Sequence, residues 1–434
     1  MSADAPQARG VLATPQQFQT ESRAIEILFS EAMKRQIAES RERMEVAPAA
    51  ATEEGRRTLE SALQELAGWA ALMAANSDPE HPSFFWTIAS PRRWHGHRVP
   101  GSRWIADNAD NVYRYSVIND SSHYVVRARP TGPKGSFSIM VYDYFTGEEG
   151  KKMEGAQGGL LDKDMRFEPD ASVIITVGPE PANGRGNHLQ TKRGACVLWS
   201  REALSDWESE RPLDLTIERV GPTPPRPSPS TQDLIPKAVS LLFNATTTML
   251  RFEDRYSPLP VNDFAKVVSR SANLGIIKLG SFKIADDEAL VIVADALDPD
   301  YWGASVLTPW LITVEHVHAS GTLNKGQAER GSDGTYTLVI SARDPGVKNW
   351  LDTNGLHEGG MAVRWQSLNS PVADPNAAIR SVRRVKLAQL RDVLPTDTNG
   401  VTPSERRLIL AARAKSYMHR CGDACEVYSG VGAE

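Results

Sequence analysis

The chain has 434 residues, of which 41% are hydrophobic and 24% charged, with a formal net charge of −5 at pH 7. This composition is typical of a globular protein of two or three domains. The net negative charge excludes a general attraction to nucleic acid or anionic membranes. No apolar run approaches the ~18 residues of a membrane helix, and the first residues lack the features of a signal peptide. We therefore expect a cytoplasmic, bacterial-type protein that binds neither nucleic acid nor membrane.

Residues 1–104 are expected to form a helical N-terminal region that ends in an aromatic loop. Apolar side chains recur at helical spacing over residues 21–45, and an Ala/Pro/Thr stretch at residues 46–52 ends this helix. A second helix follows, with leucines and Trp69 on one face. The two helices predict an antiparallel pair, or arms that cover the sheets or join a homo-oligomer. Loops as long as residues 76–111 are usually functional or packed over another element.

Two β-rich modules, residues 105–220 and 280–370, repeat the same pattern. Each copy runs from an acidic turn through an apolar strand and a loop to Asn-x-Leu-x-Thr, and then to a strand that ends in Trp. The Asn-x-Leu-x-Thr motif begins at Asn187 in the first copy and at Asn349 in the second. This period is far too long for a solenoid, so it indicates duplicated modules. Chance similarity between two β-rich segments is the alternative.

A proline-rich stretch separates the modules and is too rich in Pro for a strand or helix. We therefore assign residues 221–279 to a linker and a helical connector. Apolar spacing predicts a helix over residues 232–256, and residues 262–271 are expected to form a second, short helix.

Residues 371–434 are expected to form a helical tail. A basic segment over residues 379–394 has helical character, and the last helix begins at a capping-box pattern of Thr402 and Glu405. Together the elements predict an α+β fold with antiparallel strands in two blocks and helices at the ends and in the middle.

Three cysteines are too few for a disulfide scaffold. Cys196 lies in an apolar stretch and is expected in the core. Cys421 and Cys425 form a C-x3-C pair, but a zinc site would need two more ligands and only His419 is close. Two solvent-side thiols are therefore the expectation.

The second module carries more chemical groups than the first. On a strand, His316 and His318 would point to one face. They could share a metal ion there if His357 or Glu358 supplied a third ligand. Partly buried histidines that make hydrogen bonds are the alternative, and we expect neither a metal nor an organic cofactor.

Other polar groups of this module could bind a substrate. The amides of Asn324 and Gln327 could orient a substrate oxygen or shape a turn. An Asp-Pro-Gly turn presents Arg343 and Asp344, and Arg364 could bind a carboxylate or extend from a sheet surface. The Asn-x-Leu-x-Thr motif is expected to be architectural, because both modules contain it.

The second module resembles a bacterial family catalogued as domain of unknown function 1214. The resemblance rests on Trp302, Leu323, Asn324, Gln327, Asp333, Gly334, residues 344–355, Gly359, Arg364 and Trp365. It extends over most of residues 105–368 and implies two β-sandwich-like modules. It also hints at a lipophilic substrate, but it implies no settled reaction. The chain departs from the family pattern at Glu315 and His316, where an Asp-Tyr pair is expected, and at His188, where Trp is usual.

Two functions remain open. The first is an enzyme, a hydrolase or lyase, that uses general acid/base chemistry on a lipophilic small molecule such as a steroid, terpenoid or aromatic. Its catalytic groups would be His316, His318, Asp344, His357 and Glu358. Its substrate-binding groups would be Trp302, Trp310, Asn324, Gln327, Arg343, Asn349, Trp350, Arg364 and Trp365. The second is a non-catalytic sandwich that binds carbohydrate or lipid through tryptophans, or an assembly subunit. The common nucleotide-binding and serine-hydrolase motifs do not occur.

Overall fold

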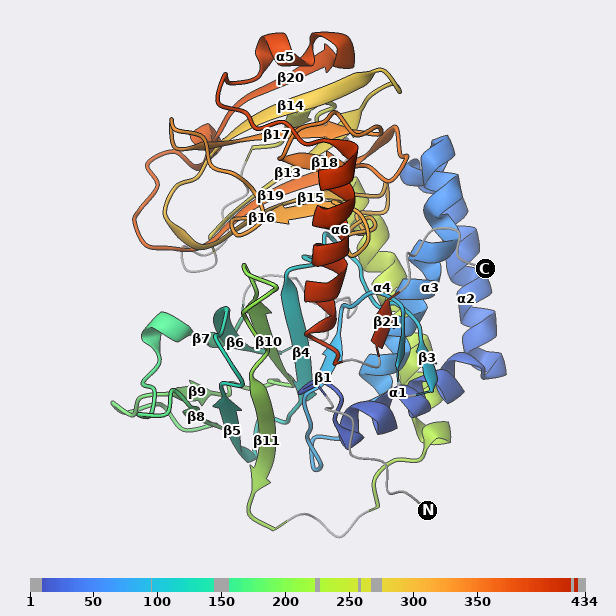
Figure 1. Cartoon of the computed structure of the whole chain (residues 1–434). Coiled ribbons are helices and arrows are strands. Elements are labelled where there is room, and N and C mark those ends of the chain that lie inside the picture. The colour runs from blue at the N-terminus through green and yellow to red at the C-terminus, as the bar shows by residue number, and fades with distance from the viewer. Residues whose placement is uncertain are drawn as a thin grey trace, which may run out of the picture.

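A computed structural model of the chain describes residues 10–94, 96–143, 156–222, 227–256, 259–266, 275–422 and 425–427. The fold is α+β, with two antiparallel β-sandwiches, a layer of helices on one flank, and a C-terminal helix that runs from one sandwich to the other (Figure 1). Among the described residues, no helix combines the length and apolar character needed to span a bilayer.

The first sandwich packs a five-stranded sheet against a four-stranded one. In spatial order the larger sheet contains β1 (Phe85–Thr87), β4 (Asn111–Val117), β10 (Val197–Ala203), β6 (Ser136–Tyr142) and β7 (Gly158–Leu161). The smaller sheet contains β11 (Asp214–Val220), β5 (His123–Arg129), β8 (Val173–Gly178) and β9 (His188–Gln190). Alternate apolar side chains of both sheets fill the space between them.

The second sandwich repeats this topology strand for strand. Its larger sheet contains β12 (Asp263–Phe264), β13 (Ile276–Lys283), β19 (Glu358–Leu368), β15 (Pro299–Leu307) and β16 (Thr322–Asn324). Its smaller sheet contains β20 (Ile379–Lys386), β14 (Glu288–Asp295), β17 (Thr335–Ser341) and β18 (Trp350–Asp352). In both sandwiches the last pair of the smaller sheet is parallel, whereas the other pairs are antiparallel. The internal repeat is therefore confirmed.

The shared asparagine plays the same structural role in both copies. Asn187 accepts a hydrogen bond from the Arg166 amide at 2.9 Å and donates one to the Arg166 carbonyl at 2.6 Å. Asn349 bonds both backbone groups of Glu329 in the same way, at 2.8 and 2.7 Å. Each asparagine fixes a preceding loop against the start of the parallel strand, which explains why the motif recurs.

Four helices form the flanking layer: α1 (Pro15–Leu28), α2 (Glu31–Glu45), α3 (Glu53–Ala75) and the connector α4 (Thr231–Tyr256). Their apolar faces join the outer face of the first sandwich in one core. The expectation of a single helix over residues 21–45 is wrong, because α1 ends at Leu28 and α2 begins at Glu31. Ser30 caps the start of α2 by accepting a hydrogen bond from the Met33 amide. The expected break before α3 is the short 3-10 helix Pro48–Ala51.

Two segments expected to be helical contain strands. Residues 379–386 form β20, an edge strand in which a bulge brings Ile379 and Val382 onto the same face. Val385 packs on the opposite face, so the three apolar residues only mimic helical spacing. Its basic side chains suit an exposed sheet edge. In the rest of this segment, up to Leu394, the helices are short: Leu387–Gln389 and Leu390–Val393. In the connector, Asp263–Phe264 is β12, and residues 267–271 lie outside the described residues.

The sandwiches also take strands from outside the expected ranges of residues 105–220 and 280–370. β1 precedes residue 105, and β20 follows residue 370. A third, small sheet joins β2 (Arg92–Trp94) and β3 (His97–Val99) to β21 (Cys425–Val427), which attaches the described C-terminal strand to the long aromatic loop.

The last helix, α6 (Pro403–Met418), begins at the expected capping box of Thr402 and Glu405. Arg406, Arg413 and, in the following turn, Arg420 stand seven residues apart, and all three are buried. Such spacing places side chains along one side of the helix. Arg406 and Arg413 bond the second sandwich, at the Val347 and His316 carbonyls respectively. Arg420 bonds the Ala109 carbonyl before the first sandwich's β4. The helix thus straps the two sandwiches together (Figure 1).

Candidate functional site

The structure separates His316 from His318. The segment around them is a bend and not a strand, because the Glu315 carboxylate accepts the amides of Val317 and His318 at 2.7 and 2.8 Å. His318 is exposed, whereas His316 is buried with Nδ1 3.0 Å from the Val314 carbonyl. Burial, reinforced by the charge of Arg103, lowers the pKa of His316 well below its ordinary value. His316 is therefore a neutral hydrogen-bonded core residue, and the shared face expected for the two histidines is wrong.

His357 and Glu358 lie elsewhere, at the start of β19. His357 contacts Asp286 and Glu54 through its two ring nitrogens, and Glu358 pairs with Lys283 at 2.9 Å. Within the described ranges, no group of three or more His, Cys, Asp or Glu side chains is arranged to hold a metal ion.

His357 forms a latch between α3 and the second sandwich whose strength depends on pH. Its Nε2 lies 2.8 Å from Asp286 and its Nδ1 lies 3.3 Å from Glu54. The hydrogen bond to Asp286, with that to Glu54, raises the pKa of His357. A raised folded-state pKa adds stability that is present below the unfolded value of about 6.5 and is lost as the pH rises through the folded value.

We expect His357→Gln to destabilise the protein more at about pH 5.5 than at about pH 8.5, because the added stability is lost as the pH rises through the folded-state pKa. The difference should be on the order of 0.5 kcal/mol, because exposed ion pairs are screened by solvent. Urea unfolding at the two pH values measures it, with exposed His318→Gln as the control. An equal loss at both pH values would contradict the latch.

The tryptophans expected to bind a substrate are buried, Trp302 and Trp365 in the core of the second sandwich and Trp310 in the core of the helical layer. Trp302 stacks on Tyr336 with ring centroids 3.9 Å apart, and Trp365 donates to the Asp295 carbonyl at 2.7 Å. Trp310 donates to the Gly55 carbonyl of the helical layer at 2.8 Å, and Trp350 lies under the guanidinium of Arg406. All ten tryptophans of the chain are buried except half-buried Trp199. The expectation that these four tryptophans bind a substrate together is therefore wrong.

The remaining candidate residues hold parts of the fold together. Asn324 donates to Asp110 at 2.8 Å, and Arg364 donates to the Ala106 carbonyl at 2.7 Å, so both connect the second sandwich to the chain that leads into β4. Gln327 and Asp344 accept bonds from the α6 residues Arg413 and Arg406. Arg343 forms an exposed pair with Asp286. Asn349 has the loop-fixing role described above.

The cysteines differ from expectation as well. Cys421 and Cys425 are buried where solvent-side thiols are expected, and burial raises the pKa of Cys421 well above its ordinary value. Cys196 is half-buried. A cavity beside His316 and Tyr417 has a volume of only about 10 Å³, which is room for about one water molecule. It is too small for a substrate.

A larger cleft, of about 270 Å³, opens between α1, the C-terminal end of α3 and the linker before α4. Its wall from α1 carries Gln16, Gln19, Thr20 and Arg23, whose spacing places them on one helix face. The opposite wall is the loop that follows α3. The lining residues are Gln16, Gln19, Thr20, Arg23, Ala75, Asn76, Asp78, His81, Pro82, Ser83 and Ser228.

The loop after α3 is closed by its own side chains. Asn76 donates to the Ser83 carbonyl and accepts from the Ser83 hydroxyl, both at 2.8 Å. Asp78 accepts the amide of Glu80 at 3.1 Å, which forms the local turn that Asp favours. Residues 76–83 therefore return on themselves.

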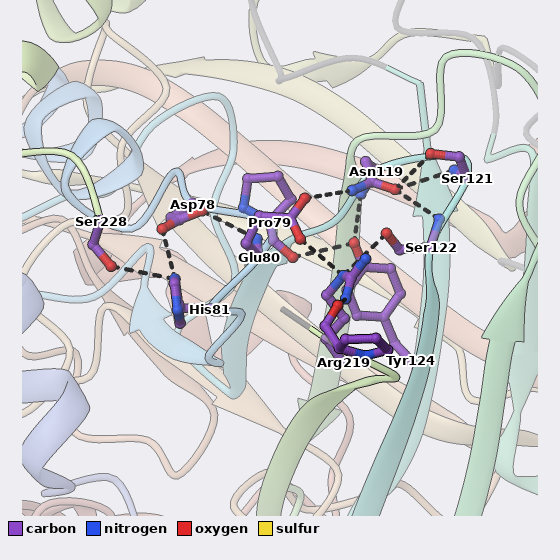
Figure 2. A network of polar contacts seen from close by, with 11 residues as sticks. Asp78, Pro79, Glu80, His81, Asn119, Ser121, Ser122, Tyr124, Arg219 and Ser228 are labelled. Atoms are coloured by element: carbon purple, nitrogen blue, oxygen red, sulfur yellow. Dashed lines mark hydrogen bonds and ion pairs between the residues drawn. The ribbon is translucent and has the colours of Figure 1, made fainter. Parts of the chain in front are cut away.

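Contacts to the first sandwich fix this loop in place (Figure 2). Glu80 pairs with Arg219 of β11 at 2.9 Å, and Asn119 donates to Glu80 at 3.3 Å. Tyr124 of β5 donates to the Pro79 carbonyl at 3.2 Å. The loop's polar residues are thus held by a rigid sheet, as a preorganised site requires.

His81 is the histidine that lines the cleft. Its Nδ1 lies 2.9 Å from Asp78 Oδ2 and 3.2 Å from the hydroxyl of Ser228 (Figure 2). A carboxylate at Nδ1 selects the tautomer that carries its proton there and leaves a basic lone pair on Nε2. The side chain of His81 is 48% exposed, whereas that of Asp78 is only 14% exposed. Because Ser228 and Asp78 share Nδ1, Ser228 is not placed as the nucleophile of a Ser-His-Asp triad, which needs the serine at Nε2.

Sequence reasoning missed this site. Asp78 and His81 stand three residues apart within the long loop of residues 76–111, and this spacing could have predicted a contact between the two side chains. Arg23 and Ser228 carry no such signal, because they reach the cleft from distant segments of the chain.

No family model matches the chain, and no curated protein matches it. Among solved structures, it is similar to an uncharacterised protein of Burkholderia cenocepacia, with 25% identity, a TM-score of 0.70, and coverage of 84% of this chain and 99% of that one. A weaker likeness links it to the VPA0106 protein of Vibrio parahaemolyticus, with 10% identity, a TM-score of 0.43, and coverage of 76% of this chain and 100% of that one. The likeness to the Burkholderia cenocepacia protein supports the fold, and the family resemblance noted above stays a prediction.

Proposed function

We propose that the protein is an enzyme of the hydrolase or lyase type, which uses His81 as a general base and then as a general acid. The observation that carries this proposal is the 2.9 Å contact between Asp78 and His81 Nδ1 in a ring that lines the cleft. The lone pair on Nε2 can take a proton from water or from a substrate, as a general base does. No organic cofactor enters this proposal.

The cleft also changes the expected substrate. Its walls carry amide, hydroxyl, guanidinium, imidazole and carboxylate groups, whereas the tryptophans expected to bind a lipophilic substrate are buried. Its volume of about 270 Å³ is slightly below the range of about 300–1,000 Å³ for drug-sized ligands. We therefore favour a small polar substrate over a steroid or terpenoid.

Asp78 has a positioning role in this proposal. It keeps the proton of His81 on Nδ1 and favours the imidazolium that forms when Nε2 takes a proton. Ser228 holds the same ring nitrogen from the linker side at 3.2 Å. Loss of the Asp78 carboxylate should therefore weaken His81 as a base, while His81 and Ser228 remain in the cleft.

We expect His81→Asn to lower turnover by at least about 100-fold, the usual contribution of a general base. A suitable screen combines hydrolysis of 4-nitrophenyl acetate and 4-nitrophenyl hemisuccinate with water elimination from small 3-hydroxy acids. Asp78→Asn should lower turnover as well, whereas exposed His318→Asn is the matched control and should retain it.

A chemical readout supports the assay. Diethyl pyrocarbonate modifies unprotonated imidazole nitrogens, so peptide mapping by mass spectrometry should show modification of His81, and that modification should abolish turnover. A substrate turned over equally by wild type and His81→Asn would contradict the proposal. The non-catalytic alternative predicts no turnover by either protein, with ligand binding that does not depend on His81.

A further inference from the structure

We propose that the cleft binds its substrate through a carboxylate group, and that Arg23 is the residue that anchors it. This inference rests on the proposed function for the choice of cleft, and it adds the chemical class of the ligand. It begins with an unusual feature of α1. One face of this helix packs Ala24 and Ile27 into the core, whereas the face toward the cleft is polar, from Gln16 to Arg23.

Arg23 differs from its neighbours in the helical layer. Arg41 pairs with Glu60, Arg57 pairs with Glu54, and Arg43 donates to Thr247. Arg23 is half-buried, yet within the described residues it has neither an acidic partner nor a hydrogen-bond acceptor. A partly desolvated guanidinium without a counter-ion favours an anionic ligand, and its planar fork matches a carboxylate in two parallel bonds.

The rest of the lining favours a single negative charge. Gln16 and Gln19 add amide donors beside Arg23, and neither amide has a partner among the described residues. Asp78 lies on the opposite wall and brings a negative charge of its own. A phosphate monoester carries close to two charges at neutral pH. With one arginine and an opposing carboxylate, the cleft therefore suits a monoanionic carboxylate better than a phosphate.

The positions of Arg23 and His81 also favour this assignment. Arg23 and His81 line the same cleft from different elements, α1 and the loop after α3. A carboxylate held by Arg23 would leave the remainder of a small molecule within the space that His81 also borders. Binding and proton transfer would then be divided between two residues, so each can be tested without the other.

Ligand-detected NMR on the full chain tests the anchor, with propionate as the probe, propionamide as its neutral analogue and inorganic phosphate as the second anion. We expect propionate to bind, propionamide to bind at least tenfold more weakly, and Arg23→Gln to lose at least tenfold in affinity. Arg23→Lys should retain part of the affinity, because the charge remains. The exposed Arg35→Gln is the matched control and should bind as wild type does.

His81→Asn separates this inference from the proposed function. If Arg23 anchors the carboxylate, His81→Asn should still bind propionate, whatever becomes of turnover. Equal binding of propionate by wild type and a folded Arg23→Gln variant would overturn the anchor, and so would equal binding of propionamide. Absence of propionate binding to wild type would overturn it too, and tighter binding of phosphate than of propionate would overturn the assignment of a carboxylate.

Discussion

Replacing Glu65 by Gln should lower the free energy of unfolding by about 3–5 kcal/mol. Glu65 of α3 is buried and accepts hydrogen bonds from the backbone amide and Nε of Arg103, both at 2.8 Å, and from its Nη2. The same guanidinium donates to the Thr313 carbonyl of the second sandwich at 2.8 Å. Gln keeps the shape of the side chain but removes the charge that compensates buried Arg103.

The local backbone is built around this carboxylate. A Cβ at Gly101 would lie 2.5 Å from the Glu65 side chain, so only glycine allows the loop to approach so closely. Because Arg103 connects α3 to Thr313, loss of its counter-charge should loosen the helical layer and the second sandwich together. The Arg103 side chain is only 7% exposed, so water cannot reach its guanidinium unless the contact between α3 and Thr313 opens.

The control for this prediction lies five residues earlier in α3. Glu60 forms an ion pair with Arg41, in which the two side chains are 48% and 39% exposed. Glu60→Gln should change stability by less than about 1 kcal/mol, as is usual for surface pairs. Urea unfolding followed by circular dichroism compares the two variants. Equal and small losses in both would show that the Glu65–Arg103 pair does not stabilise the fold.

Replacing Arg413 by Ala should destabilise the protein by about 3 kcal/mol and detach α6 first. Arg413 donates to the His316 carbonyl, to Gln327 at 2.8 Å and to Thr322 at 2.6 Å, and its guanidinium stacks 4.3 Å from the ring of Trp207. Burial lowers the pKa of Arg413 to about 10, which shows the cost of holding this charge away from water. The variant leaves buried acceptors without a donor and opens a cavity at the junction of the two sandwiches.

Hydrogen exchange read by mass spectrometry distinguishes detachment of α6 from general unfolding. Amides of residues 403–418 should exchange faster in Arg413→Ala, while those of β14 and β17 should stay protected. Arg407 is exposed on the same helix, and Arg407→Ala should change stability by no more than about 0.5 kcal/mol. Uniform acceleration across both sandwiches would contradict a strap that can open alone.

The sequence determined the features that arise from local or repeated patterns. The two modules are visible in it because each needs the same asparagine to fix a loop beside a parallel strand. The start of α6 is visible because Thr402 and Glu405 satisfy backbone groups within one turn. By contrast, the apolar residues of β20 look helical in the sequence, because the bulge opposite Val293 and Ala294 and the two faces of the strand become visible only when β20 pairs with β14.

Tertiary structure alone decided where the chemical groups lie. His316 and His318 alternate in the sequence, yet a turn closed by Glu315 buries one and exposes the other. The candidate cleft joins α1, the loop after α3 and the linker at Ser228, which meet only when the helices pack on the first sandwich. Local sequence specifies backbone hydrogen bonds and caps over a few residues, whereas a cleft depends on side chains brought together by long-range burial. That is why the repeat and α6 could be predicted, and why Arg23 and His81 emerged as neighbours only in the folded chain.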